Sequence, residues 1–315
     1  MEKQHGLLIE RAHGFWSFSH LTFQEYFTAK WFCGANWQDL AKHVTGKHWR
    51  EVFLLAAEMR RTDRLLLLMK QQIDEQFAKY AYLQNVLTLA NKKLSKDYEC
   101  IKPAVVRSFY IKLILQKNSP VEFLEIGNLI GNNNLVFGVE IGVEIGLDMS
   151  LFKALHHAQE LTSICEQDIA FPALAVVKKQ YADTLDCSIQ QAFRFSQFEI
   201  NLQQILKVLK EQLPKQDNAQ AFNNWWKDNG KAWTDKLRNV IISHRNIGLD
   251  LQFREEQKEL LQEYYYANKL LVDCLNSSFD VSDEVKKEIE EDLLLPIDEI
   301  KKRQQQRQVA DVADE

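Results

Sequence analysis

An aromatic-rich segment at residues 15–27, FWSFSHLTFQEYF, constrains the fold most, because its pattern predicts a β-strand that runs directly into an α-helix. Residues 15–19 alternate aromatic and small polar side chains, which is the period-two pattern of a strand. Residues 7–11 form a second extended run, and Gly14 between the two runs tolerates the positive φ of a tight turn. Residues 6–19 are therefore predicted to form a β-hairpin.

The helix after this hairpin carries a start signal. Thr22 and Glu25, three residues apart, fit a capping box, in which the hydroxyl and the carboxylate satisfy amide groups of the first turn. Apolar residues then recur at helical spacing, at Phe23, Phe27 and Trp31.

The rest of the chain is predicted to be mostly helical. Only five prolines and eleven glycines occur among 315 residues, so helix-breaking residues are rare. Apolar residues at three- and four-residue spacing predict helices at residues 37–44, 48–60, 64–79 and 82–96. The predicted fold class is mostly α: a short N-terminal β-hairpin, then a helical-repeat or superhelical segment, and a C-terminal helical bundle.

Helical periodicity is also clear in the second half of the chain. Residues 190–213 form the clearest amphipathic helix there, and residues 214–221, PKQDNAQA, are the best candidate for a linker. A helical hairpin or small bundle is expected after the linker. The tail at residues 298–315 has no apolar face and is predicted to be disordered.

Charge and composition argue against several protein classes. A net charge of −5 disfavours a nucleic-acid surface over the whole chain. No apolar run approaches the ~20 residues that a membrane helix needs, and no signal-peptide pattern is present, so we expect no membrane contact and a cytoplasmic location. The five cysteines include no CxxC pair and no histidine at zinc-ligand spacing, so buried thiols are expected and no metal site.

The segment SFSHLTFQEYFTA resembles the end of the winged-helix domain in NACHT-family STAND NTPases, where a GLL run, a wing hairpin and FxHLTFQEYFAA precede a helical domain. The resemblance implies that residues 1–35 end a winged-helix domain. It also implies that residues 36–213 form the helical, superhelical domain that follows, because HWREVFLLAAEM is similar to its opening segment.

The same resemblance assigns nucleotide binding to His20. In that family the motif histidine can contact the β-phosphate of bound ADP and helps to hold the closed, inactive state. Imidazole can donate to a phosphate oxygen, and its charge is tunable near neutral pH. The alternative is a histidine at a helix start that bonds a nearby carbonyl group.

Residues 222–297 resemble the NACHT C-terminal helical domain found mainly in cyanobacterial proteins. The resemblance implies the C-terminal portion of a cyanobacterial signalling NTPase that takes part in defence against phage, and it leaves the trigger open. The matching residues are Trp225, Trp226, Gly230, Trp233, Leu237, Arg238, His244, Arg245, Asn246, Ile247, Gly248, Gln252, Phe253, Glu256, Gln257, Leu260, Leu261, Tyr264, Tyr265, Ala267, Asn268 and residues 270–275.

Residues 121–147 allow two interpretations. Strict alternation of apolar residues with Gly and Glu from Val139 to Leu147 favours a strand, whereas glycines repeated every four residues would let two helices approach closely. Relatives in the resembled family carry a tract there that suits a helix. We therefore expect a helix against the local pattern.

A phosphate-binding loop of the form GxxxxGK followed by Ser or Thr does not occur in the sequence. Gly46-Lys47-His48 is the nearest approach, but it lacks the upstream glycine and the hydroxyl residue. We therefore expect no enzyme activity and no cofactor, with ATP or ADP bound only together with an N-terminal NTPase half. The expected partners are that half or other copies, contacted through helical surfaces, and the chain is expected to be a split-gene product or a truncated frame.

One alternative is catalytic. Arg238 and His244 are similar to the RxxxxxH signature of HEPN ribonucleases, in which histidine transfers protons and arginine stabilises phosphate charge without a metal. Six residues place these side chains about 120° apart around a helix, so they converge poorly. Arg238 and Arg245, seven residues apart, share a face instead.

Overall fold

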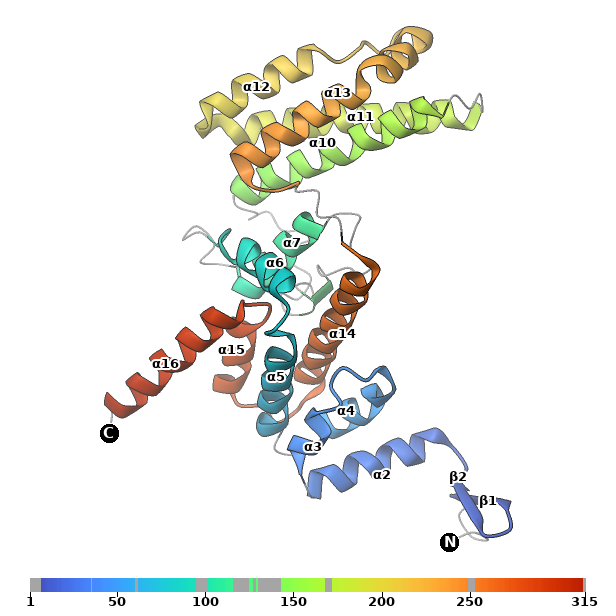
Figure 1. The fold of residues 1–315 in the computed structure, drawn as a ribbon, viewed down its shortest axis with the longest axis vertical. Helices are drawn as coiled ribbons and strands as arrows, with labels where there is room; N and C mark the ends of the chain where they lie inside the picture. Colours follow the sequence, from blue (N-terminus) through green and yellow to red (C-terminus); the bar gives the residue numbers. More distant parts are fainter. Residues whose placement is uncertain are drawn as a thin grey trace. The chain divides into compact units, whose positions relative to one another are not determined.

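The computed structural model describes residues 7–34, 36–59, 62–94, 101–115, 125–126, 129, 143–167, 172–248 and 253–313. Within these residues the chain forms α-helices and one two-stranded antiparallel sheet near its N-terminus (Figure 1). The predicted fold class, mostly α with a short N-terminal β-hairpin, is confirmed. No helix in this part of the chain is long and apolar enough to cross a membrane.

The predicted hairpin consists of β1 (Leu8–Ala12) and β2 (Phe15–Phe18). The strands pair antiparallel, with Leu8 opposite Phe18. Gly14 in the turn has a φ of 80°, which glycine adopts at least cost. Alternation and one glycine were thus sufficient to predict this element.

The next helix, α2 (Leu21–Gly34), starts earlier than the predicted capping box requires. Leu21 is already helical, and the amide of Phe23 donates to the carbonyl oxygen of His20 at 3.2 Å. Thr22 therefore lies inside the first turn and cannot take the N-cap position. The predicted capping box of Thr22 and Glu25 is wrong.

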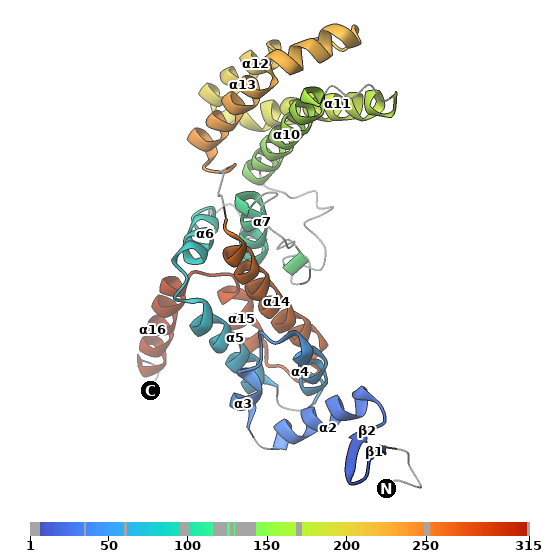
Figure 2. The ribbon, with the colours of Figure 1, turned by 45° about the vertical axis from the view of Figure 1, so that its right-hand side comes forward.

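Contacts divide the chain into two compact units, of which unit 1 contains residues 1–112, 117–136 and 253–315. The end of the chain therefore packs on its beginning, and Figure 2 shows α14 alongside α4 and α5. After α2, the helices of unit 1 are α3 (Trp37–Ala41), α4 (Arg50–Ala57), α5 (Asp63–Phe77), α6 (Ala81–Asn91), most of α7 (Pro103–Leu115), α14 (Glu255–Ser277), α15 (Asp283–Asp292) and α16 (Ile297–Ala313).

Unit 2 contains residues 113–116 and 137–252. Its helices are α10 (Val143–Glu166), α11 (Pro172–Phe195), α12 (Ile200–Glu211) and α13 (Ala219–Arg245). Gly230 lets α13 approach α10 closely, because an added Cβ would lie 3.0 Å from Thr162 Oγ1. The hydroxyl oxygens of Thr162 and Thr234 are 3.2 Å apart across the same contact.

The single helix predicted for residues 190–213 is wrong, because α11 ends at Phe195 and α12 starts at Ile200. Glu199 between them leaves helical geometry, with φ −111° and ψ 71°. The predicted linker at residues 214–221 overlaps the connection from α12 to α13, residues 212–218, which lies within unit 2. The indole nitrogen of Trp233 donates to the Leu209 carbonyl oxygen at 3.1 Å, which ties these helices together.

The tail predicted to be disordered, residues 298–315, instead belongs largely to α16. Arg303 and Arg307 pair with Asp292 of α15 at 3.2 and 3.1 Å. Ile300 in the first turn of this helix is buried, and the ion pairs to α15 add contacts that no apolar pattern in the sequence would reveal.

The helix expected within residues 121–147 is present from Val143, where α10 begins. Gly146 faces the Phe195 ring, 2.9 Å from where a Cβ would stand, so this glycine does permit a close approach. Most of residues 121–142 lie outside the described part of the chain. The domain limits at residues 35, 213 and 222 stay predictions; the contact units follow other limits.

Candidate functional site

The predicted nucleotide contact, His20, lies exposed at the start of α2. Its carbonyl oxygen accepts the Phe23 amide, and its ring lies edge-on to the Phe23 ring with centroids 5.9 Å apart. The side chain is thus accessible to a ligand or partner, and its role stays a prediction.

The predicted ribonuclease pair lies on α13, and the structure does not bring the two side chains to a common partner. Arg238 donates from Nη1 to Asp235 Oδ1 on its own helix at 3.2 Å. His244 is exposed near the end of α13. The nearby basic residue that is held by other helices is Arg245.

Arg245 joins three segments of unit 2 by charge. Its Nε lies 2.5 Å from Asp148 Oδ1 of α10, and its Nη1 lies 2.7 Å from Glu199 Oε1 ahead of α12. Asp148 is fully buried, and Glu144 adds a weaker contact at 3.7 Å. Burial alone would lower the pKa of Arg245, but the hydrogen bond to Asp148 and the surrounding carboxylates raise it.

The chain after Arg245 turns sharply, which fixes where α13 ends. Asn246 is the C-cap residue in the left-handed region, with φ 52°, and its amide donates to the Ile242 carbonyl oxygen. Gly248 follows with φ 77°. Asparagine and glycine tolerate this region best, so Asn-Ile-Gly is the local signal that stops the helix beside Arg245.

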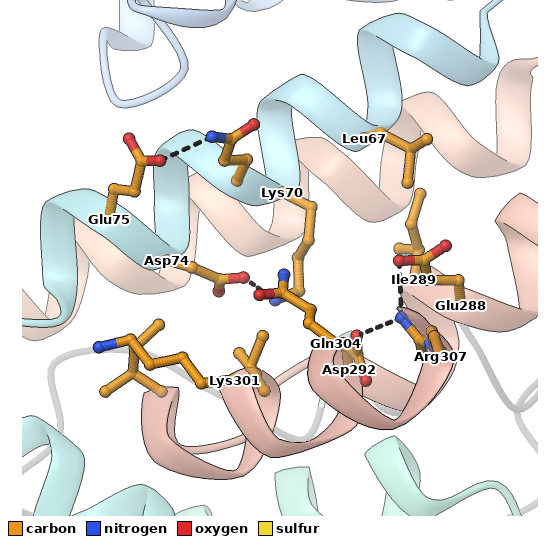
Figure 3. Close-up of a pocket in the computed structure, with 13 residues that line it drawn as sticks. Leu67, Lys70, Asp74, Glu75, Glu288, Ile289, Asp292, Lys301, Gln304 and Arg307 are labelled. Carbon is orange, nitrogen blue, oxygen red and sulfur yellow. Dashed lines mark hydrogen bonds and ion pairs between the residues drawn. The ribbon is translucent and has the colours of Figure 1, made fainter. Parts of the chain in front are cut away.

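A polar hollow of about 560 Å³ lies in unit 1 between α5, α15 and α16. Figure 3 shows Gln304 of α16 pointing toward Lys70 and Asp74 of α5, and Arg307 of α16 beside Asp292 and Glu288 of α15. Lys70 donates to Asp74 one turn later on α5, and both side chains are largely buried. A Lys and an Asp four residues apart share a helix face, which is why α5 can supply this pair.

Burial dominates the electrostatics of this hollow. It raises the pKa of Asp74, and the charge of Lys70 offsets only part of that effect. The neighbouring Tyr264 is fully buried, and its pKa is raised by burial and then by the charge of Asp74. Asp292, with a side chain 5% exposed, is neutralised by Arg303 and Arg307.

The lining of the hollow limits its chemistry. Carboxylates, cations and amides line it, together with a few aliphatic side chains, and no hydroxyl, thiol or imidazole is among its lining groups. In the described part of the chain, no group of three or more His, Cys, Asp or Glu side chains is placed to hold a metal ion. The hollow therefore favours binding and helix–helix contact over nucleophilic catalysis.

The helices from α12 to α15, which carry Arg245 and Asp292, make up the part of the chain that is similar to a known family. Residues 202–296 match the family model for NACHT C-terminal Helical domain 2. No curated protein and no solved structure matches the chain. The C-terminal part of the chain is thus similar to a helical domain of NACHT proteins.

The matched helical domain 2 region begins at residue 202, inside α12, whereas residue 222 was the predicted start of the corresponding domain. Contacts group residues 202–252 with unit 2 and residues 253–296 with unit 1. The region contributes Arg245, which contacts the buried Asp148 in unit 2, and Asp292, which lines the polar hollow of unit 1. Each of these two sites is completed by helices outside the match, namely α10 in unit 2 and α5 and α16 in unit 1.

No sequence pattern predicted a role for Asp148, Asp74 or Asp292. One signal was available for Asp148: it stands three residues after Ile145 and three before Leu151, on the apolar face of α10. A carboxylate on such a face is rarely buried without a cationic partner. The partner itself, 97 residues away, could not be identified from the pattern.

Proposed function

We propose that this chain is a non-catalytic regulatory or sensor portion of a NACHT-type signalling NTPase, from a cyanobacterium, that acts in the cytoplasm in defence against phage. The observation that carries the proposal is the match of residues 202–296 to NACHT C-terminal Helical domain 2. The lack of a GxxxxGK loop in the sequence supports a regulatory rather than hydrolytic role.

The surface of the N-terminal segment supports a partner half. The hairpin and α2 expose large apolar side chains, which is typical of a surface that another protein covers. These side chains are Ile9, Phe15, Trp16, Leu21, Tyr26, Phe27 and Trp31. We propose that residues 1–35 end a winged-helix domain and that an NTPase half, joined to this chain or separately encoded, covers them.

Co-purification tests this proposal. We expect the chain to form a complex with a NACHT half that carries a phosphate-binding loop, and we expect ADP to strengthen it. ADP should increase the affinity of the complex about tenfold less in His20→Ala than in the unchanged chain. A tenfold change in affinity is the magnitude of one charge-assisted hydrogen bond. His13→Ala is the matched control, because His13 is an exposed histidine in the hairpin turn.

A second pair of variants tests the apolar contact. Trp31→Ser should weaken the complex with or without nucleotide, whereas Phe279→Ser, at a side chain 90% exposed outside this segment, should not. No complex under any nucleotide condition, or measurable ATP hydrolysis by the pure chain that survives contaminant controls, would overturn the proposal.

The ribonuclease alternative can be tested with the same preparation. It requires RNA cleavage without divalent metal that disappears in His244→Ala. Because Arg238 bonds Asp235 and not His244, we expect no cleavage that depends on these two residues.

A further inference from the structure

A smaller hollow of unit 1, of about 260 Å³, lies between the loop before α4 and the middle of α14. Gly46, Lys47 and Arg50 contribute one side of it. The other side comes from α14, through Tyr266, Lys269 and Asp273. Both views place α4 beside α14 (Figures 1 and 2).

Positive charge dominates the lining of this hollow. Lys47, Arg50 and Lys269 face a single lining carboxylate, Asp273, which is shared by Arg50 at 3.2 Å and Lys269 at 3.4 Å. Two further carboxylates, outside the lining, pair with these cations. Glu51 pairs with Arg50 and Glu125 with Lys269, and their side chains are 53% and 47% exposed.

Lys47 differs from the other two cations in its surroundings. Its ammonium lies over the Tyr266 ring, 4.3 Å from the centroid, and within the described residues no carboxylate pairs with it. A cation–π contact at an exposed site contributes only weakly. The ammonium is therefore available to an incoming anion.

Tyr266 gives the hollow a flat apolar surface next to these charges. Its side chain is 40% exposed, although it belongs to a helix whose neighbouring residues Tyr264 and Tyr265 are buried. A planar ring can stack on a tyrosine face in place of the ammonium. The Lys47 side chain would then swing from the ring toward the anion.

We propose that this hollow binds a small organic phosphate that carries a planar ring, such as a mononucleotide. The phosphate lies among Lys47, Arg50 and Lys269, and the ring stacks on Tyr266. Cations that form charge-assisted hydrogen bonds are the usual protein partners of phosphate oxygens. The volume limits the ligand to about the size of one nucleotide. This inference does not depend on the proposed function, because it involves neither His20 nor a partner half.

Calorimetric titration of the full chain with the four common nucleoside monophosphates, and separately with inorganic pyrophosphate, tests the inference. We expect at least one nucleotide to bind with a dissociation constant below about 1 mM. Lys47→Gln should weaken the binding of both kinds of probe by about tenfold. Tyr266→Leu should weaken nucleotide binding by about fivefold and leave pyrophosphate unaffected.

Lys79→Gln is the matched control, because the Lys79 ammonium also lies over a tyrosine ring, that of Tyr80 at 5.1 Å, but does not line this hollow. It should bind as the unchanged chain does. Lys47 and Tyr266 are exposed, so their variants should keep the fold, which circular dichroism checks. Absence of nucleotide binding overturns the inference. So does equal behaviour of Lys47→Gln and Lys79→Gln, or a nucleotide affinity that Tyr266→Leu leaves unchanged.

Discussion

Arg107 of unit 1 and Arg245 of unit 2 are both largely buried, but different groups hold them. Arg107 is fully buried and donates to two backbone carbonyl oxygens, those of Leu293 at 2.9 Å and Glu291 at 2.5 Å. Arg245 meets carboxylates instead, with Asp148 and Glu199 in direct contact. One guanidinium is held by neutral dipoles and the other by opposite charges.

The pKa values of the two side chains move in opposite directions. Burial lowers the pKa of Arg107 to about 9, with repulsion from Arg303 adding to the effect and Asp292 offsetting part of it. The carboxylates around Arg245 raise its pKa despite burial. Arg107 therefore positions the turn between α15 and α16, where Leu294 has φ 57°, whereas Arg245 binds helices together by charge.

The largest effect is expected from Arg245→Met. It removes the guanidinium that contacts the fully buried Asp148, and loss of one member of a buried pair costs about 3–5 kcal/mol. Urea unfolding should show the loss, and hydrogen exchange should increase in α10 and α13 more than in α5. Replacing Asp148 by Leu in the Arg245→Met chain should restore part of the stability. A loss below about 1 kcal/mol in the single variant would contradict the ion-pair role.

A smaller effect is expected from Arg107→Met. The change removes two hydrogen bonds to carbonyl groups, worth about 1–3 kcal/mol together, but it also removes a buried cation whose Nη1 finds no partner within the described residues. Hydrogen exchange should increase at residues 291–300. Arg107→Lys is the control, since a single ammonium cannot span both carbonyl oxygens, and it should not restore full protection. If Arg107→Met destabilised the chain as much as Arg245→Met, the distinction between the two sites would fail.

The same comparison explains what the sequence could and could not predict. The hairpin and most helices follow from local alternation, helical spacing and Gly14, so they were predicted. The contacts of Arg107 and Arg245 join residues up to 186 positions apart, and no local pattern encodes them. The helix α16 was missed for another reason: ion pairs to α15 hold it, and the sequence of the tail shows no broad apolar stripe.

The stability of unit 1 should depend on pH through Asp74. Because burial raises the pKa of Asp74, the folded state binds its proton more tightly than the unfolded state. Its contribution to stability is fully present below the unfolded pKa, near 3.9, and is lost as pH rises through the folded value. Relative to Asp74→Asn, the unchanged chain should therefore gain stability as pH falls from 7 toward 4 in urea unfolding. A difference that is independent of pH would contradict the raised pKa.

The smallest effect, and one of opposite sign, is expected from His157 in unit 2. Burial lowers the pKa of this imidazole, and the neighbouring charges of His156 and Lys153 lower it further. A base with a depressed pKa contributes stability that is present above its unfolded pKa, near 6.5, and is lost as pH falls through the folded value. Compared with His157→Phe, the unchanged chain should lose stability between pH 7 and 5, measured as hydrogen exchange in α10. The ring is partly exposed, so solvent screening keeps the effect small.

His43→Phe is the control, because the His43 ring is stacked on Trp49 in unit 1, and it should leave the acid response of α10 unchanged. If both histidine variants changed the acid response of hydrogen exchange in α10 equally, His157 would not be its cause. Protonation of another group would then have to destabilise α10.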